Sequence, residues 1–369
     1  MPQADCSPGI PRSAEWQPER TAQAHHSTTP TTQLRTTLIG QSSRYSEPVS
    51  NRGPGALLEP EDVEQARARI DGRVHVTPTM SVTTLGDELG VRLHLKAELF
   101  QKTGSFKPRG VFNKLLSMSR TDLSRGLVSM SAGNHAAALA YGATAVGARA
   151  TIVMPATAMP SKVQATKRYG GEVVQTEGSV LDACLALQRE RDLTLVHPFD
   201  DLAIMAGQGT VGLELLQQVP NADMVVVPVG GGGLISGIAV AVKLQRPSIR
   251  VVGVEPHGAD AMSRSLERGA PVHLETVDTI ADGLAPPFAG EHTLRHVEHF
   301  VDEMVRVADS EIVDALRVLI QRAKLAAEPS GGASLAALLS GRASPAAGST
   351  VVCVISGGNV APDVLKNLL

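Results

Sequence analysis

The chain has 369 residues, which is enough to bury a large hydrophobic core and to form two domains or one large domain with lobes. Its formal net charge is −3 and no block of like charges is present, which argues against a nucleic-acid or anionic-membrane binder. No apolar stretch approaches the roughly 18 residues of a membrane-spanning helix, and the N-terminus has no apolar signal segment, so we expect a soluble protein that is not secreted.

The three cysteines are isolated from one another. Cys6 lies near the N-terminus, Cys184 and Cys353 lie in apolar runs, and no C-x-x-C pair indicates a metal or redox site. This usage is typical of a reduced, cytoplasmic protein. Small neutral or anionic molecules remain compatible as ligands.

Residues 1–57 form a segment of unusual composition. They are rich in Ser, Thr, Pro, Gln and Arg and show neither helical nor strand periodicity. Such a segment cannot bury enough apolar area to offset the entropy lost on ordering, so we expect a disordered N-terminal tail. An organellar transit peptide and an upstream extension of the reading frame are alternatives. The transit peptide is disfavoured by the acidic residues Asp5, Glu15, Glu19 and Glu47.

From Glu59 onward, short β-branched apolar runs alternate with Ala- and Leu-rich helical stretches. The predicted strand and helix pairs are Leu127–Ser131 with Asn134–Val146, Ala150–Met154 with Ser161–Tyr169, Glu172–Gln175 with Val180–Arg191, and Met224–Val229 with Leu234–Leu244; two further strands fit Val251–Val254 and Val351–Ile355. Continuous apolar strands separated by helices indicate parallel strands buried on both faces, and hence an α/β fold. In such sheets, ligands bind at the carboxyl ends of the strands.

Four consecutive glycines, Gly230–Gly233, lie directly after one predicted strand and before a helix. Glycines let successive backbone N–H groups turn toward one anion, and the helix adds its positive N-terminal dipole. The pattern predicts a phosphate site. A flexible turn is the simpler alternative, but it does not require the entropy cost of four glycines. No Gly-Lys-Ser/Thr follows, so this is not a Walker loop, and the Rossmann spacing does not match cleanly.

Two other strand ends carry polar loops. Ser131–His135 offers backbone N–H groups, a hydroxyl and an amide, which suit a carboxylate, although Ser131 or Asn134 could equally be a helix N-cap. Ser356–Asn359 offers a hydroxyl that can reach a ring nitrogen, although a Gly-Gly turn is the plainer interpretation.

Lys107 is the candidate reactive group. It lies between Phe106 and Pro108, near the expected start of a helix, and Gly104 permits a tight approach of the backbone. A lysine reacts with a carbonyl compound when its pKa is lowered, as happens beside apolar walls and a helix N-terminus. Any single lysine is usually a solvated surface charge. The combination with a phosphate site and two strand-end loops favours the reactive interpretation.

These motifs resemble one known family. The segments Lys96–Gly110, Ser131–His135, Gly230–Gly233, Ile280–Gly283 and Ser356–Asn359 are similar, in this order and spacing, to those of the threonine dehydratase and serine racemase family. That family belongs to the fold type II, or tryptophan synthase β-like, pyridoxal-phosphate enzymes. The resemblance covers roughly Glu59 to Leu369. The cysteine synthase branch is less similar, because its carboxylate loop begins Thr-Ser-Gly-Asn-Thr where this chain has Ser-Ala-Gly-Asn-His.

The resemblance implies an architecture. We expect two open, twisted, mostly parallel sheets flanked by helices, with the cofactor in a cleft between a large and a small domain. The large domain would comprise residues 58–116 and 199–369, and the small domain residues 117–198. A homodimer is also implied.

The resemblance further implies the site residues. Pyridoxal 5′-phosphate would be bound by Phe106, Lys107, Asn134, Gly230, Gly231, Gly232, Gly233, Leu234 and Ser356. Lys107 would carry the cofactor and remove the α-proton, Asn134 would contact the 3′-oxygen, and the hydroxyl of Ser356 would leave the pyridine nitrogen neutral, which favours β-elimination. The substrate carboxylate would be bound by Ser131, Gly133, Asn134 and His135.

The implied reaction is dehydration and deamination of L-threonine or L-serine, giving 2-oxobutyrate or pyruvate and ammonia. The alternatives are a 3-hydroxyaspartate dehydratase or another lyase of β-substituted amino acids, then a serine racemase or a non-catalytic homologue that binds the cofactor. Ala132 stands where serine racemases carry a second serine, so racemisation is not expected. The chain stops shortly after Asn359, so an isoleucine-sensing regulatory domain is not expected.

A divalent cation is a further implied ligand. Glu255 and the carbonyl of Ala259 match the Mg²⁺ or Ca²⁺ site of racemase-like members, but Ala261 stands where a second carboxylate is expected. These cations favour several oxygen ligands, and one carboxylate with one carbonyl supplies few of them.

Overall fold

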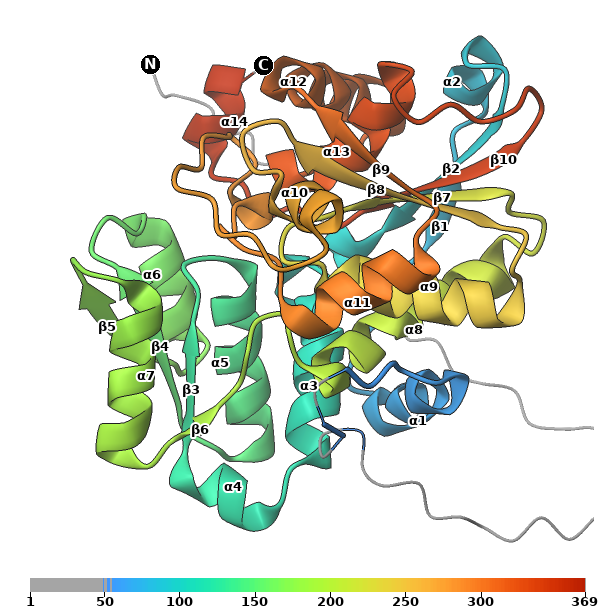
Figure 1. The fold of residues 1–369 in the computed structure, drawn as a ribbon. Coiled ribbons are helices and arrows are strands. Elements are labelled where there is room, and N and C mark those ends of the chain that lie inside the picture. Colours follow the sequence, from blue (N-terminus) through green and yellow to red (C-terminus); the bar gives the residue numbers. More distant parts are fainter. Residues whose placement is uncertain (1–48, 50–51, 54, 369) are drawn as a thin grey trace, which may run out of the picture. The chain divides into compact units, whose positions relative to one another are not determined.

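The structure is a computed structural model that describes residues 49, 52, 53 and 55–368 (Figure 1). The predicted disordered tail, residues 1–57, therefore lies largely outside the described residues. Among the described residues that precede position 58, Arg52 donates two hydrogen bonds of 2.8 and 2.9 Å to the carboxylate of Asp62 in helix α1 (Pro60–Ile70). Contacts with the folded part of the chain thus begin before the predicted limit of the tail.

The larger sheet has six strands in the order β1-β2-β10-β7-β8-β9. These strands are β1 Thr79–Ser81, β2 Arg92–Ala97, β7 Met224–Pro228, β8 Arg250–Pro256, β9 Glu303–Val307 and β10 Thr350–Ile355. All neighbours pair in parallel except β1, which is antiparallel to β2. The carboxyl ends of β7 and β10 therefore lie at the same edge of the sheet, where the predicted phosphate loop and the Ser356 loop follow.

The smaller sheet has four parallel strands in the order β5-β4-β3-β6. They are β3 Leu127–Met130, β4 Ala150–Pro155, β5 Glu172–Thr176 and β6 Thr194–Leu195. The prediction of two mostly parallel sheets is confirmed. All four strands fall inside the range predicted for the small domain, residues 117–198, but the domain boundaries themselves stay a prediction.

Helices cover both faces of the larger sheet because its strands are apolar on both sides. Val225 and Val227 of β7 belong to a core with helices α8 (Leu202–Gln218), α9 (Gly233–Gln245) and α11 (Glu291–Phe300). Val226, between them in sequence, belongs to the core on the other face, with α2 (Thr83–Glu88), α12 (Asp309–Val318) and α13 (Pro329–Leu339). This alternation follows from the two-residue period of a strand.

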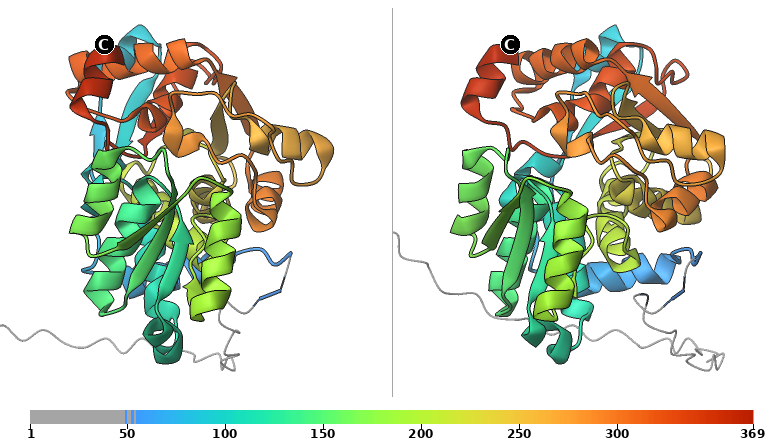
Figure 2. Two further views of the ribbon diagram at one scale, coloured as in Figure 1. Left: turned by 90° about the vertical axis from the view of Figure 1, so that its left-hand side faces the viewer. Right: turned by 60° about the vertical axis from the view of Figure 1, so that its left-hand side comes forward.

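The smaller sheet is covered in the same way, as Figure 2 shows. One face packs against α3 (Lys107–Ser117), α5 (Asn134–Val146) and α6 (Pro160–Arg168), and the other against α7 (Val180–Arg191). The helices predicted at Asn134–Val146 and Val180–Arg191 are present with those bounds. Shorter helical segments of the described chain are α4 Arg120–Arg125, α10 Ala261–Arg268, α14 Pro362–Leu368, η2 Glu98–Phe100, η3 Lys102–Gly104, η4 Asp282–Leu284 and η5 Leu319–Ala323.

No helix among residues 55–368 combines the length and the apolar character needed to cross a bilayer.

Helices α8 and α9 approach each other through glycines. A Cβ atom placed on Gly237 would lie 2.1 Å from the carbonyl oxygen of Met205 and 2.5 Å from the backbone nitrogen of Gly209. Since α9 begins at the four-glycine loop, this close packing also fixes where that loop lies relative to α8.

Gly237→Ala should lower the free energy of unfolding by roughly 1–3 kcal/mol, because backbone atoms of α8 must move to admit the methyl group. This is the net loss of stability, after the gain of about 1 kcal/mol that alanine normally brings to a helix interior has been subtracted. Urea-induced unfolding measures the change. The matched control is Gly178→Ala, where the nearest atom to the new Cβ is 3.8 Å away. Equal stability of the two variants would contradict this description of the α8–α9 contact.

Candidate active site

A pocket of about 1190 Å³ opens where loops at the carboxyl ends of both sheets meet. It is lined by every residue that the sequence predicts to bind cofactor or substrate: Phe106, Lys107, Ser131, Gly133, Asn134, His135, Gly230, Gly231, Gly232, Gly233, Leu234 and Ser356. Segments far apart in sequence are thus brought to one site. The two predicted metal ligands, Glu255 and Ala259, do not line the pocket.

The loop before Lys107 is held against the loop after β10. Ser105 and Gly357 form an antiparallel bridge, the N–H of Phe106 donates to the carbonyl of Ser356 at 3.1 Å, and the N–H of Gly358 donates to the carbonyl of Gly104 at 2.9 Å. Gly104 has φ of +76°, which favours glycine, and a Cβ there would lie 2.4 Å from Oδ1 of Asn359. The pairing places Lys107, the first residue of α3, beside the end of the central strand β10.

The amino group of Lys107 lies in the pocket between a backbone carbonyl and an aromatic ring. Its Nζ donates a hydrogen bond of 2.9 Å to the carbonyl of Pro198 and lies 5.1 Å from the centroid of the Phe106 ring. Burial lowers the pKa of Lys107 from 10.5 to about 8, and the carboxylate of Glu328 acts in the opposite direction. A larger share of the amine is therefore neutral and nucleophilic near pH 7 than at an exposed lysine.

The four-glycine loop presents unused hydrogen-bond donors to the pocket. Within the described residues, the backbone N–H groups of Gly230 to Leu234 donate to no other protein group. Side chains are excluded from the loop, because a Cβ on Gly231 would lie 2.4 Å from the ring of Phe199 and Gly232 has φ of +90°. Free N–H groups at the N-terminus of α9 make a site for an anion of the size of a phosphate group.

In the loop Ser131–His135, neither Ser131 nor Asn134 is the N-cap residue of helix α5. The N-cap is Gly133, Asn134 is the first helical residue, and the hydroxyl of Ser131 accepts a hydrogen bond from the N–H of Gly133 at 3.1 Å. The alternative N-cap interpretation of Ser131 and Asn134 is therefore wrong. Both residues line the pocket instead.

His135 is buried and neutral. The hydroxyl of Ser129 donates to the carbonyl of Val196 at 2.6 Å, so its oxygen is left to accept from Nε2 of His135 at 3.1 Å. The proton accordingly resides on Nε2, and Nδ1 is an acceptor without a partner among the described residues. Burial, followed by the charge of Lys107, holds the pKa of His135 well below its ordinary value.

Ser356 is buried at the end of β10 and lines the pocket. Its hydroxyl donates a long hydrogen bond of 3.5 Å to the carbonyl of Ser330, near the start of α13. A contact of this length is weak, so the hydroxyl is available to a ligand in the pocket.

Phe199 and Glu328 are among the pocket residues that the sequence analysis did not identify, and Asn359 was included only as the last residue of the loop Ser356–Asn359, without a role. Glu328 is buried, and its Oε1 accepts a hydrogen bond of 2.6 Å from Nδ2 of Asn134. Nδ2 of Asn359 donates at 2.8 Å to Oδ1 of Asn134. A glutamate before a proline is an ordinary helix start in sequence, so no local signal marks Glu328 as a pocket residue.

The predicted metal site is not supported. Both carboxylate oxygens of Glu255 are already used: Oε1 accepts from the N–H of Met262 at 2.8 Å, and Oε2 accepts from the N–H and the hydroxyl of Ser263 at 2.9 and 2.6 Å. Glu255 thus caps the N-terminus of α10. Among residues 55–368, no group of three or more His, Cys, Asp or Glu side chains could hold a metal ion.

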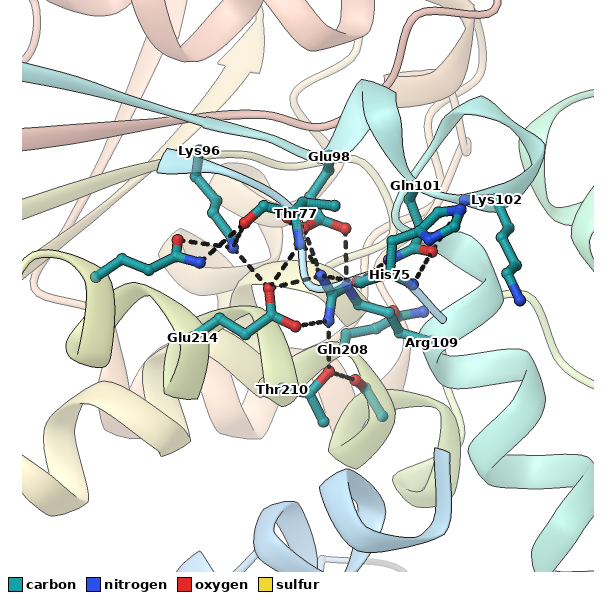
Figure 3. A network of polar contacts seen from close by, with 12 residues as sticks. His75, Thr77, Lys96, Glu98, Gln101, Lys102, Arg109, Gln208, Thr210 and Glu214 are labelled. Atoms are coloured by element: carbon teal, nitrogen blue, oxygen red, sulfur yellow. Dashed lines mark hydrogen bonds and ion pairs between the residues drawn. The ribbon is translucent and has the colours of Figure 1, made fainter. Parts of the chain in front are cut away.

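A buried polar network surrounds Arg109, which lies in the first turn of α3, as Figure 3 shows. The guanidinium of Arg109, fully buried, forms paired hydrogen bonds with Glu98 at 2.8 and 2.8 Å and with Glu214 at 2.6 and 2.9 Å. Nζ of Lys96 also donates to Glu214, at 2.6 Å. The two cations and two carboxylates balance, and they join β2 and η2 to α3 and α8.

The chain is similar to known proteins in both sequence and structure. The family described as "Pyridoxal-phosphate dependent enzyme" matches residues 70–357. L-threonine ammonia-lyase of Thermotoga maritima is 41% identical over 317 residues, which cover 85% of this chain and 78% of that protein. The structure of maize serine racemase superposes with a TM-score of 0.81 at 40% identity, covering 85% of this chain and 97% of the other. The structure of a T.th. threonine deaminase has a TM-score of 0.78 at 40% identity, with 82% and 99% covered.

Arg109→Met should lower the free energy of unfolding by about 3–5 kcal/mol, because it leaves the carboxylates of Glu98 and Glu214 buried without their main partner. Urea-induced unfolding at pH 7 measures the loss. Arg67→Met is the matched control: Arg67 pairs with Glu64 on the surface, with 51% and 43% of the side chains exposed, and its loss should cost less than about 1 kcal/mol. Similar losses for the two variants would show that the network does not hold α3.

Proposed function

This chain belongs to the family of pyridoxal-phosphate dependent enzymes, and on that premise we propose that it eliminates water and ammonia from L-threonine or L-serine. The products would be 2-oxobutyrate or pyruvate. The observation that carries the proposal is the meeting, in one pocket, of a lysine with a lowered pKa and a loop of free backbone N–H groups. The threonine ammonia-lyase and threonine deaminase relatives support the choice of reaction.

The pocket residues fit pyridoxal phosphate. The N–H groups of Gly230 to Leu234 would hold its phosphate, Phe106 would pack against its ring, and Lys107 would bind it covalently. When bound, the cofactor supplies an electron sink that acidifies the α-carbon of an amino acid and lets a β-substituent leave.

Lys107 would act as the base. Its pKa of about 8 lies close to physiological pH, so Nζ can both accept the α-proton and give it up again within one turnover. The carbonyl of Pro198, 2.9 Å away, holds Nζ in place without adding charge. A proton taken by a single base returns to the face from which it came.

The loop 131–135 would bind the substrate carboxylate. Because Nδ1 of His135 is a buried acceptor on a neutral ring, the ring cannot donate to a carboxylate from that side. The backbone N–H groups at the start of α5 are the donors that remain, assisted by the hydroxyl of Ser131. His135 would thus serve the carboxylate through its backbone, with its ring held by Ser129.

Ser356 would lie at the pyridine nitrogen of the cofactor. A hydroxyl there leaves that nitrogen uncharged, whereas a carboxylate would keep it protonated and stabilise long-lived carbanions. Buried Ser356 therefore favours rapid loss of the β-hydroxyl over exchange of the α-proton.

Location and assembly are also proposals. A cytoplasmic location rests on the cysteine pattern, and a homodimer rests on the family resemblance. The proposed reaction depends on neither the location nor the dimer.

The residue at position 132, an alanine, allows elimination to be distinguished from racemisation by experiment. It lines the pocket and brings no hydroxyl to the face of the substrate opposite Lys107, so L-serine should yield pyruvate and ammonia with no accumulation of D-serine. The measurement is chiral chromatography of L-serine incubated with the cofactor-loaded protein, alongside pyruvate release. L-Threonine, giving 2-oxobutyrate, is the parallel substrate. D-Serine appearing as fast as pyruvate would contradict the assignment and favour a racemase.

A further inference from the structure

Glu328 carries a carboxylate that does not serve its own helix. It is the N-cap residue of α13, yet its side chain makes no capping hydrogen bond to that helix. It is only 4% exposed and forms no ion pair within the described residues. A buried carboxylate without a partner cation is costly, so its presence calls for a role in the site.

The carboxylate is held at a defined place. The backbone N–H of Glu328 donates to the carbonyl of Gly357 at 3.1 Å, which ties it to the loop that follows β10. A Cβ on Gly357 would lie 2.6 Å from Oε1 of Glu328, so the glycine is needed to leave room for the carboxylate. Oε1 then meets Nδ2 of Asn134 at 2.6 Å.

Both the oxygen and the nitrogen of the Asn134 side-chain amide are therefore held by hydrogen bonds. Its Oδ1 accepts from Asn359 at 2.8 Å, and one N–H of Nδ2 donates to Glu328. Asn359 is held in turn by the carbonyl of Thr103, to which it donates at 2.6 Å. An amide has two N–H bonds, so one N–H of Asn134 has no partner among the described residues of the pocket.

We propose that Glu328 is a positioning residue: its ionised carboxylate, which can only accept hydrogen bonds, fixes the amide of Asn134 so that the remaining N–H serves the 3′-oxygen of the cofactor. This inference rests on the function proposed above. A protonated carboxyl would lose the strict acceptor character that orients the amide.

Burial, together with the charges around it, places the titration of Glu328 near neutral pH. Burial, followed by the charge of Asp282, raises the pKa of Glu328 to about 7, while the hydrogen bond from Asn134 and the charge of Lys162 act to lower it. The third charged group that faces it is Lys107 of α3. Lys162 and Asp282 form an ion pair with each other. Orientation of Asn134 should therefore weaken as the pH falls through about 7.

The test uses pyridoxine 5′-phosphate, which keeps the ring oxygen and the phosphate but has no aldehyde to react with Lys107. Its Kd for the full-length cofactor-free protein is measured by calorimetry between pH 6 and pH 8.5. For the unmodified protein, Kd should rise as the pH falls, by up to about tenfold per unit below the titration of Glu328. Glu328→Gln, which keeps the shape but cannot ionise, should lack the part of this rise that is centred near pH 7, while any titration of Lys107 or of the ligand's phosphate stays in both profiles.

Glu255→Gln is the matched control. Glu255 is also buried and its pKa is also raised to about 7, but its carboxylate caps α10 away from the pocket. The part of the rise in Kd that is centred near pH 7 should persist in this variant. Loss of that part in Glu255→Gln, or its persistence in Glu328→Gln, overturns the proposal.

A double-mutant cycle shows whether Glu328 acts through Asn134 or through the charge of Lys107. In an Asn134→Ala background, Glu328→Gln should have no further effect on Kd or on its pH profile. Effects that add independently overturn the positioning role while leaving the proposed enzyme function intact. A cofactor-free protein that binds neither pyridoxine 5′-phosphate nor pyridoxal phosphate at any pH overturns both.

Discussion

Four charged side chains, nearly all removed from water, set the position of the helix that carries Lys107. Arg109 lies two residues after the lysine and is held by Glu98 and Glu214, while Lys96 balances the second carboxylate. Burying these groups is favourable only when all of them are in place, because each unpaired member would keep its full desolvation cost. The first turn of α3 therefore has one acceptable position. From that position, the short bridge from Ser105 to Gly357 brings the lysine to the end of β10.

Within the pocket, the same exclusion of water shifts the pKa values of an amine and a carboxyl toward each other. The pKa of Lys107 falls to about 8 and that of Glu328 rises to about 7, so both groups titrate close to neutral pH. The carboxylate of Glu255, which is also buried, is instead satisfied by the N-terminus of α10. The N–H groups after β7 and Nδ1 of His135 are left incompletely satisfied, and they belong to residues that line the pocket.

Sequence patterns predicted most of the strands that contain a run of apolar residues. Apolar runs predicted β3, β4, β5, β7, β8 and β10. The combination of Lys107 with the glycine loop and two strand-end loops predicted a shared site, and the family resemblance supported it. Strand β2 was not predicted, because Arg92 and Lys96 make its six residues look like surface, and the buried partner of Lys96, Glu214, lies far along the chain. Glu328 was missed for the same reason: its role depends on Asn134, which only the folded chain brings near. The metal prediction failed because local sequence does not reveal that Glu255 caps a helix.

The most direct test of the central claim, that Lys107 carries the cofactor in this pocket, is chemical trapping. Protein loaded with pyridoxal phosphate is reduced with borohydride, digested, and mapped by mass spectrometry for the lysine that bears the phosphopyridoxyl group. The modification should be found at Lys107 in close to one equivalent, and should be absent from that site in Lys107→Ala. Stoichiometric labelling of a different lysine, or none after reduction of the loaded protein, would contradict the assignment of the site.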